Sequence, residues 1–143
     1  MKLVMAQLNF TVGDIPGNAD KIVKVIHENP DSDLIVFSEL AITGYYPMDL
    51  IERKGFLDEQ ERALQQIKEA SRKCPAAVVV GFIDENQWRG KPFHNALALI
   101  RGGVTLYTYH KQLLPTYNIF DEARHFAPGN LPGVFELDGV RLG

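Results

Sequence analysis

Continuous apolar runs constrain the fold of this chain more than any other feature. One run is DLIVF, at residues 33–37, and another is AAVVVGF, at residues 76–82. A strand with one solvent-facing side alternates polar and apolar residues, whereas an uninterrupted run is typical of a strand covered on both faces. We therefore expect residues 33–37 to be a central strand of a layered α/β fold, and residues 76–82 to be a further strand.

Two segments carry apolar residues at helical spacing, residues 18–29 and residues 58–75. Asn18 is a residue type that caps helices, so we expect the first helix to begin there. Asp58 and Glu61 have the spacing of a capping box, so the second helix is predicted to begin at Asp58.

Strands and turns account for the remaining pattern. Residues 3–10 predict a first strand, and residues 95–100 and 104–109 predict a hairpin closed by the Gly-Gly pair between them. Residues 110–143 read as loop, with a second hairpin signal at 138–139. The order predicts an α/β fold (α+β by strict class) with a mixed sheet and helices against one face.

The composition excludes several classes of protein. The chain has 143 residues, a formal net charge of −3 and one cysteine. A length of this order allows one domain, and the charge gives no electrostatic footprint for nucleic acid or an anionic membrane. A single cysteine excludes an internal disulfide, so we expect a cytoplasmic protein. Cys74 lies on an apolar helical stripe and is expected to be a small buried side chain and not a nucleophile.

Two charged residues stand where strands are predicted to end. Glu39 follows the strand at 33–37, at the edge where layered α/β proteins bind ligands, and is a candidate general base. Lys111 ends the strand TLYTYHK and is a second candidate. The alternatives are a glutamate that only accepts backbone hydrogen bonds and a solvated lysine. The four histidines lack metal-ligand spacing, and we expect no metal site.

The segment YNIFDEARHF, at residues 117–126, mixes aromatic and charged side chains and suits a small polar ligand. Its alternative is a surface loop that Tyr117 and Phe120 pin to the core. In that alternative Arg124 pairs with Asp121 or Glu122.

The motifs together resemble the nitrilase (carbon–nitrogen hydrolase) superfamily. They are FSEL followed by TGYYP, VVVGF, and YHKQLLPTYNIFDEARHF. The last of these is most similar to the glutaminase domains of glutamine-dependent NAD synthetases. The resemblance implies a partial αββα sandwich, with residues 1–143 as the N-terminal part of a glutaminase domain and no second domain.

The resemblance also implies roles for individual residues. Glu39 and Lys111 are expected to be catalytic, as general base and oxyanion-stabilising cation beside a cysteine nucleophile. The glutamine pocket is expected to include four residues: Tyr45, Tyr117, Phe120 and Glu122. The implied partners are glutamine and a C-terminal synthetase domain of the same chain, which would use ATP and Mg.

The sequence departs from the family where the nucleophile is expected, because no cysteine follows residue 74. We therefore expect these 143 residues alone to be inactive, and an incomplete sandwich to self-associate as a homo-oligomer. Two alternatives remain open: part of another amidase of the superfamily, and a non-catalytic binding or assembly module.

Overall fold

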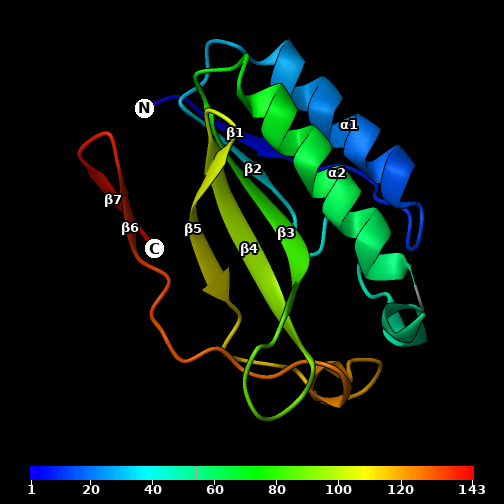
Figure 1. Ribbon diagram of the computed structural model, residues 1–143. Helices are drawn as coiled ribbons and strands as arrows, with labels where there is room; N and C mark the ends of the chain where they lie inside the picture. Colours follow the sequence, from blue (N-terminus) through cyan, green and yellow to red (C-terminus); the bar gives the residue numbers. More distant parts are fainter. Residues whose placement is uncertain (54) are drawn as a thin grey trace.

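A five-stranded mixed sheet forms the centre of the computed structural model, which describes residues 1–53 and 55–143 (Figure 1). Its strands follow one another in chain order: β1 (Leu3–Ala6), β2 (Leu34–Phe37), β3 (Ala77–Glu85), β4 (Phe93–Arg101) and β5 (Val104–His110). The first three strands are mutually parallel, and β4 and β5 are added as antiparallel hairpins. The expected mixed α/β sheet is confirmed.

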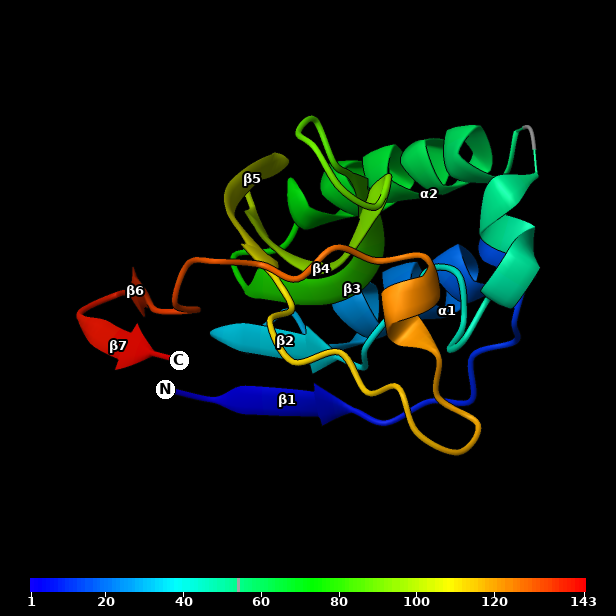
Figure 2. The ribbon, with the colours of Figure 1, turned by 90° about the horizontal axis from the view of Figure 1, so that it is seen from below.

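Two helices, α1 (Ile15–Glu28) and α2 (Phe56–Ser71), cover one face of this sheet side by side (Figures 1 and 2). Each turns an apolar stripe toward the strands, with Ile22 of α1 and Ile67 of α2 fully buried. Two short 3₁₀ helices lie in loops: η1 (Met48–Glu52) and η2 (Glu122–Arg124). The two long helices do not cover the opposite face of the sheet.

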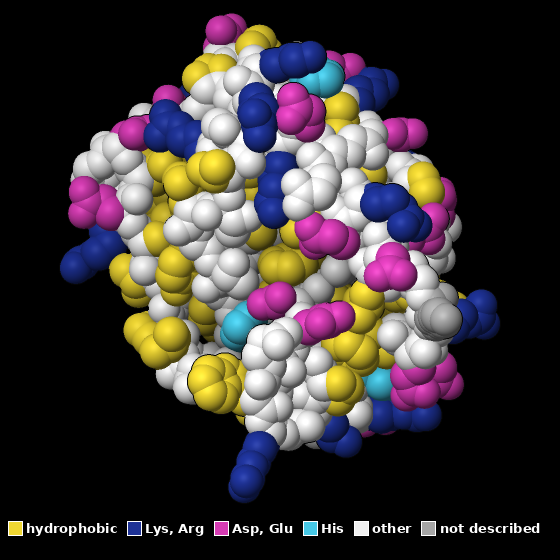
Figure 3. Space-filling view, viewed as in Figure 1, with side chains coloured by type: hydrophobic (Ala, Val, Ile, Leu, Met, Phe, Trp, Pro, Cys, Tyr) yellow, Lys and Arg dark blue, Asp and Glu magenta, His cyan; other side chains and the backbone are white. Residues whose placement is uncertain are grey.

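That opposite face is only partly covered, by a ribbon of β6 (Phe135–Leu137) and β7 (Val140–Leu142). Between ribbon and sheet lies an apolar groove of about 430 Å³, and Figure 3 shows apolar side chains gathered there. Its lining includes Leu34, Val79 and Leu97. The second hairpin signal is confirmed, and β2 and β3 have apolar contacts on both faces.

The predicted helix starts are wrong. α1 begins at Ile15, and the Asp14 side chain accepts a hydrogen bond from the backbone N–H of Gly17. Asn18 is instead fully buried, and its amide bonds the backbone of Thr11 and the carbonyl of Ile42. A buried asparagine with several partners serves as a bridge between loops, which local spacing does not reveal.

Three further boundaries differ from the predictions. α2 begins at Phe56 after Gly55, so Asp58 lies in the first turn, where its charge faces the helix N-terminus. β1 ends at Ala6 and not at residue 10, and α2 ends at Ser71 and not at residue 75. None of the helices among the described residues is both long and apolar enough to cross a bilayer.

Candidate active site

The topology brings three polar residues to one edge of the sheet. β5 runs parallel to β2 and β3, so the chain leaves β2 and β5 at the same edge, and β4 begins there. Glu39 follows β2, Lys111 follows β5, and Asn95 lies near the start of β4. Carboxyl ends of strands are where open α/β sheets place their ligands.

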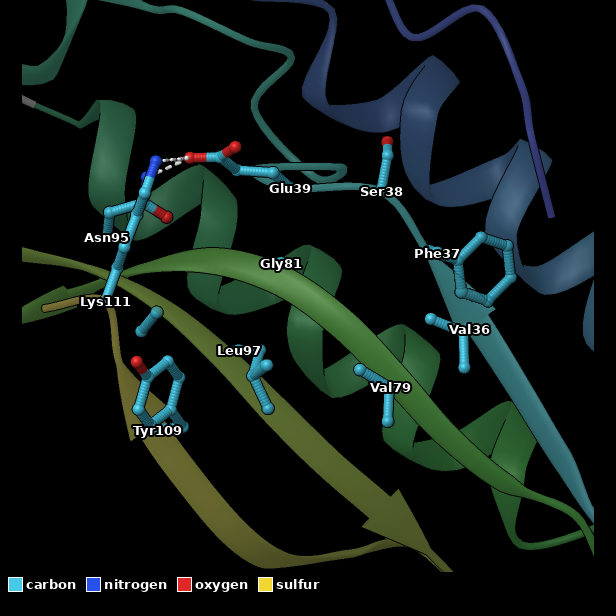
Figure 4. Close-up of a pocket in the computed structure, with 11 residues that line it drawn as sticks. Val36, Phe37, Ser38, Glu39, Val79, Gly81, Asn95, Leu97, Tyr109 and Lys111 are labelled. Carbon is cyan, nitrogen blue, oxygen red and sulfur yellow. Dashed lines mark hydrogen bonds and ion pairs between the residues drawn. The ribbon is translucent and has the colours of Figure 1, made fainter. Parts of the chain in front are cut away.

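The three side chains are in direct contact (Figure 4). The ammonium of Lys111 donates to Oε1 of Glu39 across 2.7 Å, and the amide of Asn95 donates to the same oxygen across 2.5 Å. Both donors come from neighbouring strands, since the backbone N–H of Lys111 bonds the carbonyl of Asn95 at 2.8 Å. Glu39 is thus positioned by two side chains while 42% of its own side chain stays exposed.

A second carboxylate, that of Glu122 in η2, contacts the same ammonium from the segment that follows β5. Its Oε1 accepts from Lys111 at 3.0 Å and from the hydroxyl of Tyr45 at 2.8 Å. Its side chain has no exposed surface. A fully buried carboxylate is stable only with such donors, so Glu122 and Lys111 depend on one another.

The two carboxylates determine the protonation states of Lys111 and Tyr45. Burial lowers the pKa of Lys111, but hydrogen bonds and charge interactions with Glu39 and Glu122 raise it more, so this pKa lies above that of an ordinary lysine. Burial and the bond to Glu122 raise the pKa of the Tyr45 phenol well above its usual range. At neutral pH Lys111 is therefore a fixed cation, and Tyr45 is a hydrogen-bond donor.

The backbone behind Glu39 requires a glycine. A Cβ at Gly81 would collide with the backbone nitrogen of Leu40 and the carbonyl oxygen of Ser38. Leu40 itself has a positive φ of 46°. The absent side chain at Gly81 in β3 lets the turn after β2 lie against the sheet, which places Glu39 over its edge.

A pocket of about 260 Å³ opens beside this cluster. Glu39, Asn95 and Lys111 stand at one end, and apolar side chains extend along the sheet from there (Figure 4). These apolar residues are Val36, Val79, Leu97 and Tyr109. The pocket joins a charged end to an apolar floor, as small-molecule sites commonly do.

The four residues expected in the glutamine pocket form a connected group, although none of them lines this pocket. Glu122 bonds Tyr45, whose ring lies 6.3 Å from that of Phe120. Phe120 in turn meets Tyr117 edge-on at 5.7 Å. Tyr117 is 64% exposed, so the alternative in which it pins the loop to the core is wrong.

Asn95 is the functional candidate that the sequence analysis missed. The available signal was a polar residue near the start of an otherwise apolar strand, in NALALI. In the surface-loop alternative Arg124 pairs with Asp121 or Glu122, but its guanidinium lies 3.1 Å from Asp49 of η1. The pairing differs because η1 packs beside this loop, which the sequence order does not indicate.

Cys74 is buried in the core, as expected. It precedes β3, whereas Glu39 follows the parallel strand β2, so the two residues lie at opposite ends of the sheet. This placement separates the thiol from the charged cluster.

Comparisons with known proteins show the family of this chain. The family model of carbon-nitrogen hydrolases matches residues 2–143. A glutamine-dependent NAD(+) synthetase from Aquifex aeolicus is 43% identical over 143 residues, which are 99% of this chain and 24% of that protein. The structure of the glutamine-dependent NAD+ synthetase from Acinetobacter baumannii matches with a TM-score of 0.88 and 30% identity, over 97% of this chain and 26% of that one.

The fold extends to more distant proteins. The crystal structure of an amidase from Nesterenkonia sp. matches with a TM-score of 0.82 at 21% identity, over 99% of this chain and 53% of that one. Fold and site therefore define a mixed α/β protein with a carboxylate–lysine cluster at the sheet edge. The chain belongs to the carbon-nitrogen hydrolase family. It spans about a quarter of the length of the synthetases that it matches.

Proposed function

We propose that this chain is the N-terminal part of the glutaminase unit of a glutamine-dependent NAD synthetase, with Glu39 and Lys111 as two of its catalytic groups. One observation carries the proposal: an ammonium lies 2.7 Å from an exposed carboxylate and 3.0 Å from a buried one, at the ligand-binding edge of the sheet. The names of the synthetase relatives support the choice of substrate.

The proposed reaction is hydrolysis of the glutamine side-chain amide through a thioester. Glu39 takes the proton of a cysteine thiol, and the thiolate attacks the amide carbon. The amide oxygen then becomes an oxyanion, which the Lys111 ammonium stabilises. Glu39 returns the proton to the amide nitrogen, so the C–N bond breaks and ammonia leaves. Glu39 finally takes a proton from the water that hydrolyses the thioester to glutamate.

The contacts of Lys111 fit the role of a cation better than that of a base. Its raised pKa keeps it charged at neutral pH, and two carboxylates hold its position. Glu122 has no exposed side-chain surface and is bonded to Tyr45 as well. We therefore assign Glu122 to holding Lys111, in addition to shaping the glutamine pocket with Tyr45, Phe120 and Tyr117.

The nucleophile belongs to the complete protein, outside residues 1–143. Cys74 is the single cysteine of the chain, and it is buried at the opposite end of the sheet. We expect the 143 residues alone to be inactive, and we place the ATP- and Mg²⁺-dependent amidation to NAD in a C-terminal synthetase domain. We also propose that the whole enzyme is cytoplasmic.

The open face of the sheet supports a proposal on association. Leu3 of β1 lines the apolar groove under β6 and β7 and is 51% exposed, and Met5, two residues further along the same strand, is 80% exposed. Exposed apolar surface of this kind favours self-association. We expect light scattering on the isolated chain to give the mass of a dimer or larger species, and a monomer that melts cooperatively would contradict this.

The function is tested in the complete protein with Glu39→Gln, which keeps the shape of the side chain and removes the base. We expect glutamine-supported NAD synthesis to be lost, while free ammonia still supports it, because ammonia bypasses the glutaminase reaction. The matched control is Glu136→Gln, at an exposed position of β6. We expect the control to retain both activities.

Other outcomes separate the alternatives. Loss of both activities in Glu39→Gln would assign a structural role to Glu39 and contradict the proposal. Hydrolysis of an amide without any NAD synthesis would favour another amidase of the family. Turnover of neither glutamine nor another amide by the complete protein would favour a binding or assembly module.

A further inference from the structure

A second cluster of potential ligands lies outside the charged site. Asp49 and Glu52 project from η1, and His125 follows η2, far away in the sequence. One ligand atom from each of these three residues lies within 4.8 Å of the others. Nε2 of His125 is 3.7 Å from an oxygen of Asp49 and 3.3 Å from an oxygen of Glu52.

The imidazole of His125 is the strongest indication that this cluster binds a ligand. The residue is 4% exposed, and its Nε2 has no hydrogen-bond partner within the part of the chain that the structure describes. Buried polar atoms are nearly always paired, so such an atom requires an explanation. It faces the two carboxylates, which are themselves exposed to solvent.

The other ring nitrogen shows which form of the imidazole is suited to this position. Nδ1 of His125 lies 2.6 Å from the hydroxyl of Tyr46, and that hydroxyl donates to the carbonyl of Asp121 at 3.2 Å. A hydroxyl has one proton, so both contacts form together only in the tautomer in which Nδ1–H donates to the Tyr46 oxygen. A neutral imidazole then has a lone pair on Nε2, directed at two anionic oxygens. Three electron-rich atoms this close together repel one another, and a cation between them would remove that repulsion.

We propose that Asp49, Glu52 and His125 bind one divalent transition-metal ion, with Zn²⁺ as the matching probe. One imidazole nitrogen and two carboxylate oxygens form a donor set that first-row divalent ions accept, and water completes the coordination. The hydrogen bond from Nδ1–H to Tyr46 is the kind of contact that orients a metal-bound histidine.

The bound ion would join two loops that meet beside the active site. η1 supplies two ligands, and His125 stands three residues after Glu122, which contacts Lys111. The ion therefore links η1 to the segment that carries the buried carboxylate. No metal site was expected from the sequence because the histidines lack metal-ligand spacing, and the fold alone brings these three residues together.

Arg124 competes for the same position. Its guanidinium lies 3.1 Å from the Asp49 oxygen that faces His125, and 57% of its side chain is exposed. A cation bound there is repelled by this neighbouring charge. Removing a ligand carboxylate should therefore weaken binding of the ion, whereas removing the charge of Arg124 should strengthen it.

The test is calorimetric titration of the metal-free complete protein with ZnCl₂ in the absence of nucleotide. We expect Glu52→Gln and Asp49→Asn to lower the affinity of one zinc site at least about tenfold, as loss of metal-site contacts does. Arg124→Gln should tighten the same site. These three positions are on the surface, so the variants are expected to fold, and circular dichroism checks that they do.

The control is His27→Ala, which removes a histidine from the exposed surface of α1. Zinc should raise the melting temperature of the native protein and of this control, but not that of Glu52→Gln. Equal zinc binding by the native protein and Glu52→Gln would overturn the proposal. Loss of binding in His27→Ala, or no effect of Arg124→Gln, would indicate adventitious surface binding and contradict it as well.

Discussion

Two carboxylate pairs lie on either side of the Tyr45–Tyr46 segment, and they differ in the cation that faces them. Glu39 and Glu122 enclose the ammonium of Lys111, which the chain itself supplies. Asp49 and Glu52 face a buried imidazole nitrogen that has no hydrogen-bond partner among the described residues. Tyr45 donates to the first cluster and Tyr46 contacts the second.

The difference shows how placement decides the chemistry of similar groups. The first cluster is positioned by strand ends, so its ammonium is fixed at a pocket and available to a substrate. The second lies between two short loops, away from that pocket, so it is suited to holding loops together.

Removing the cation should have the largest effect. Lys111→Met keeps much of the side-chain volume but leaves the buried Glu122 facing Glu39 without the ammonium. We expect glutamine-supported synthesis to fall by about 10²–10³-fold or more, the loss typical for an oxyanion-stabilising group. The unpaired buried carboxylate should also cost about 1–3 kcal/mol of stability. Steady-state rates and thermal melts measure both effects.

Lys24→Met provides the matched control, since the ion pair of Lys24 with Glu28 on α1 is exposed. We expect this variant to keep its rate and its melting temperature. If Lys111→Met retained glutamine-supported synthesis, the role of the ammonium would be refuted.

Lys111→Met also tests the raised pKa of Lys111 through the pH dependence of stability. The pKa of Lys111 is raised in the folded protein, so its ion pairs contribute fully below the unfolded lysine pKa of about 10.4. This stability is lost only as the pH rises through the higher folded pKa. We expect the stability difference between native protein and Lys111→Met to stay constant from neutral pH to about pH 10. A decline of that difference within this range would contradict the raised pKa.

Gly81→Ala should displace Glu39 without touching its carboxylate. A methyl group there collides with the backbone of Leu40, and overpacking of this kind costs about 1–3 kcal/mol. We expect reduced glutamine-supported synthesis and a lower melting temperature, with ammonia-supported synthesis retained. Gly102→Ala is the comparison variant: a Cβ there meets nothing within 4 Å, but the φ of 61° strains it, so its melting temperature should fall while glutamine-supported synthesis is retained. Unchanged glutamine use in Gly81→Ala would show that the turn has room to adjust.

Asn95→Ala should have a smaller effect, because Lys111 still holds Glu39. The hydrogen bond from the side-chain amide of Asn95 positions Glu39, but the amide carries no charge. We expect glutamine-supported turnover to fall about tenfold, corresponding to one hydrogen bond of about 1.5 kcal/mol. The fall should lie in kcat and not in KM, since Asn95 positions Glu39. A lowered melting temperature with an unchanged kcat would assign Asn95 a structural role only.

Tyr45→Phe should have the smallest effect of the series. It removes the hydroxyl that donates to Glu122, while Lys111 and the ring packing against Phe120 remain. Hydrogen bonds to charged groups contribute about 1.5–3 kcal/mol, and the remaining Lys111 contact offsets part of that loss. We expect a modest fall in melting temperature and a small rise in KM for glutamine. A loss as large as that of Lys111→Met would mean that Tyr45 acts directly on the substrate.

The sequence predicted the residues whose position depends on one strand. Glu39 and Lys111 each follow a recognisable strand, and parallel strands end at one edge, so their meeting could be anticipated. Asn95 contacts them across two strands, and its role depends on the register of β3, β4 and β5. Local periodicity carries no register information, so Asn95 was missed.

The loops were less predictable for a related reason. Asn18 has the chemistry of a helix cap, but the fold uses it to satisfy the backbone of two loops. The cluster of Asp49, Glu52 and His125 forms only because η1 packs beside the segment after Lys111. Contacts between loops distant in sequence depend on tertiary packing, which outweighs local preference at such positions.

A double-mutant cycle tests the proposal that Glu39 and Lys111 act as one catalytic unit. Glutamine-supported rates of the complete protein are measured for Glu39→Gln, Lys111→Met and the variant carrying both, each normalised to its ammonia-supported rate. Residues that act together lose little more in the double variant than in the worse single one. We predict that result, whereas losses that multiply would mean that the two residues act independently and would contradict the account.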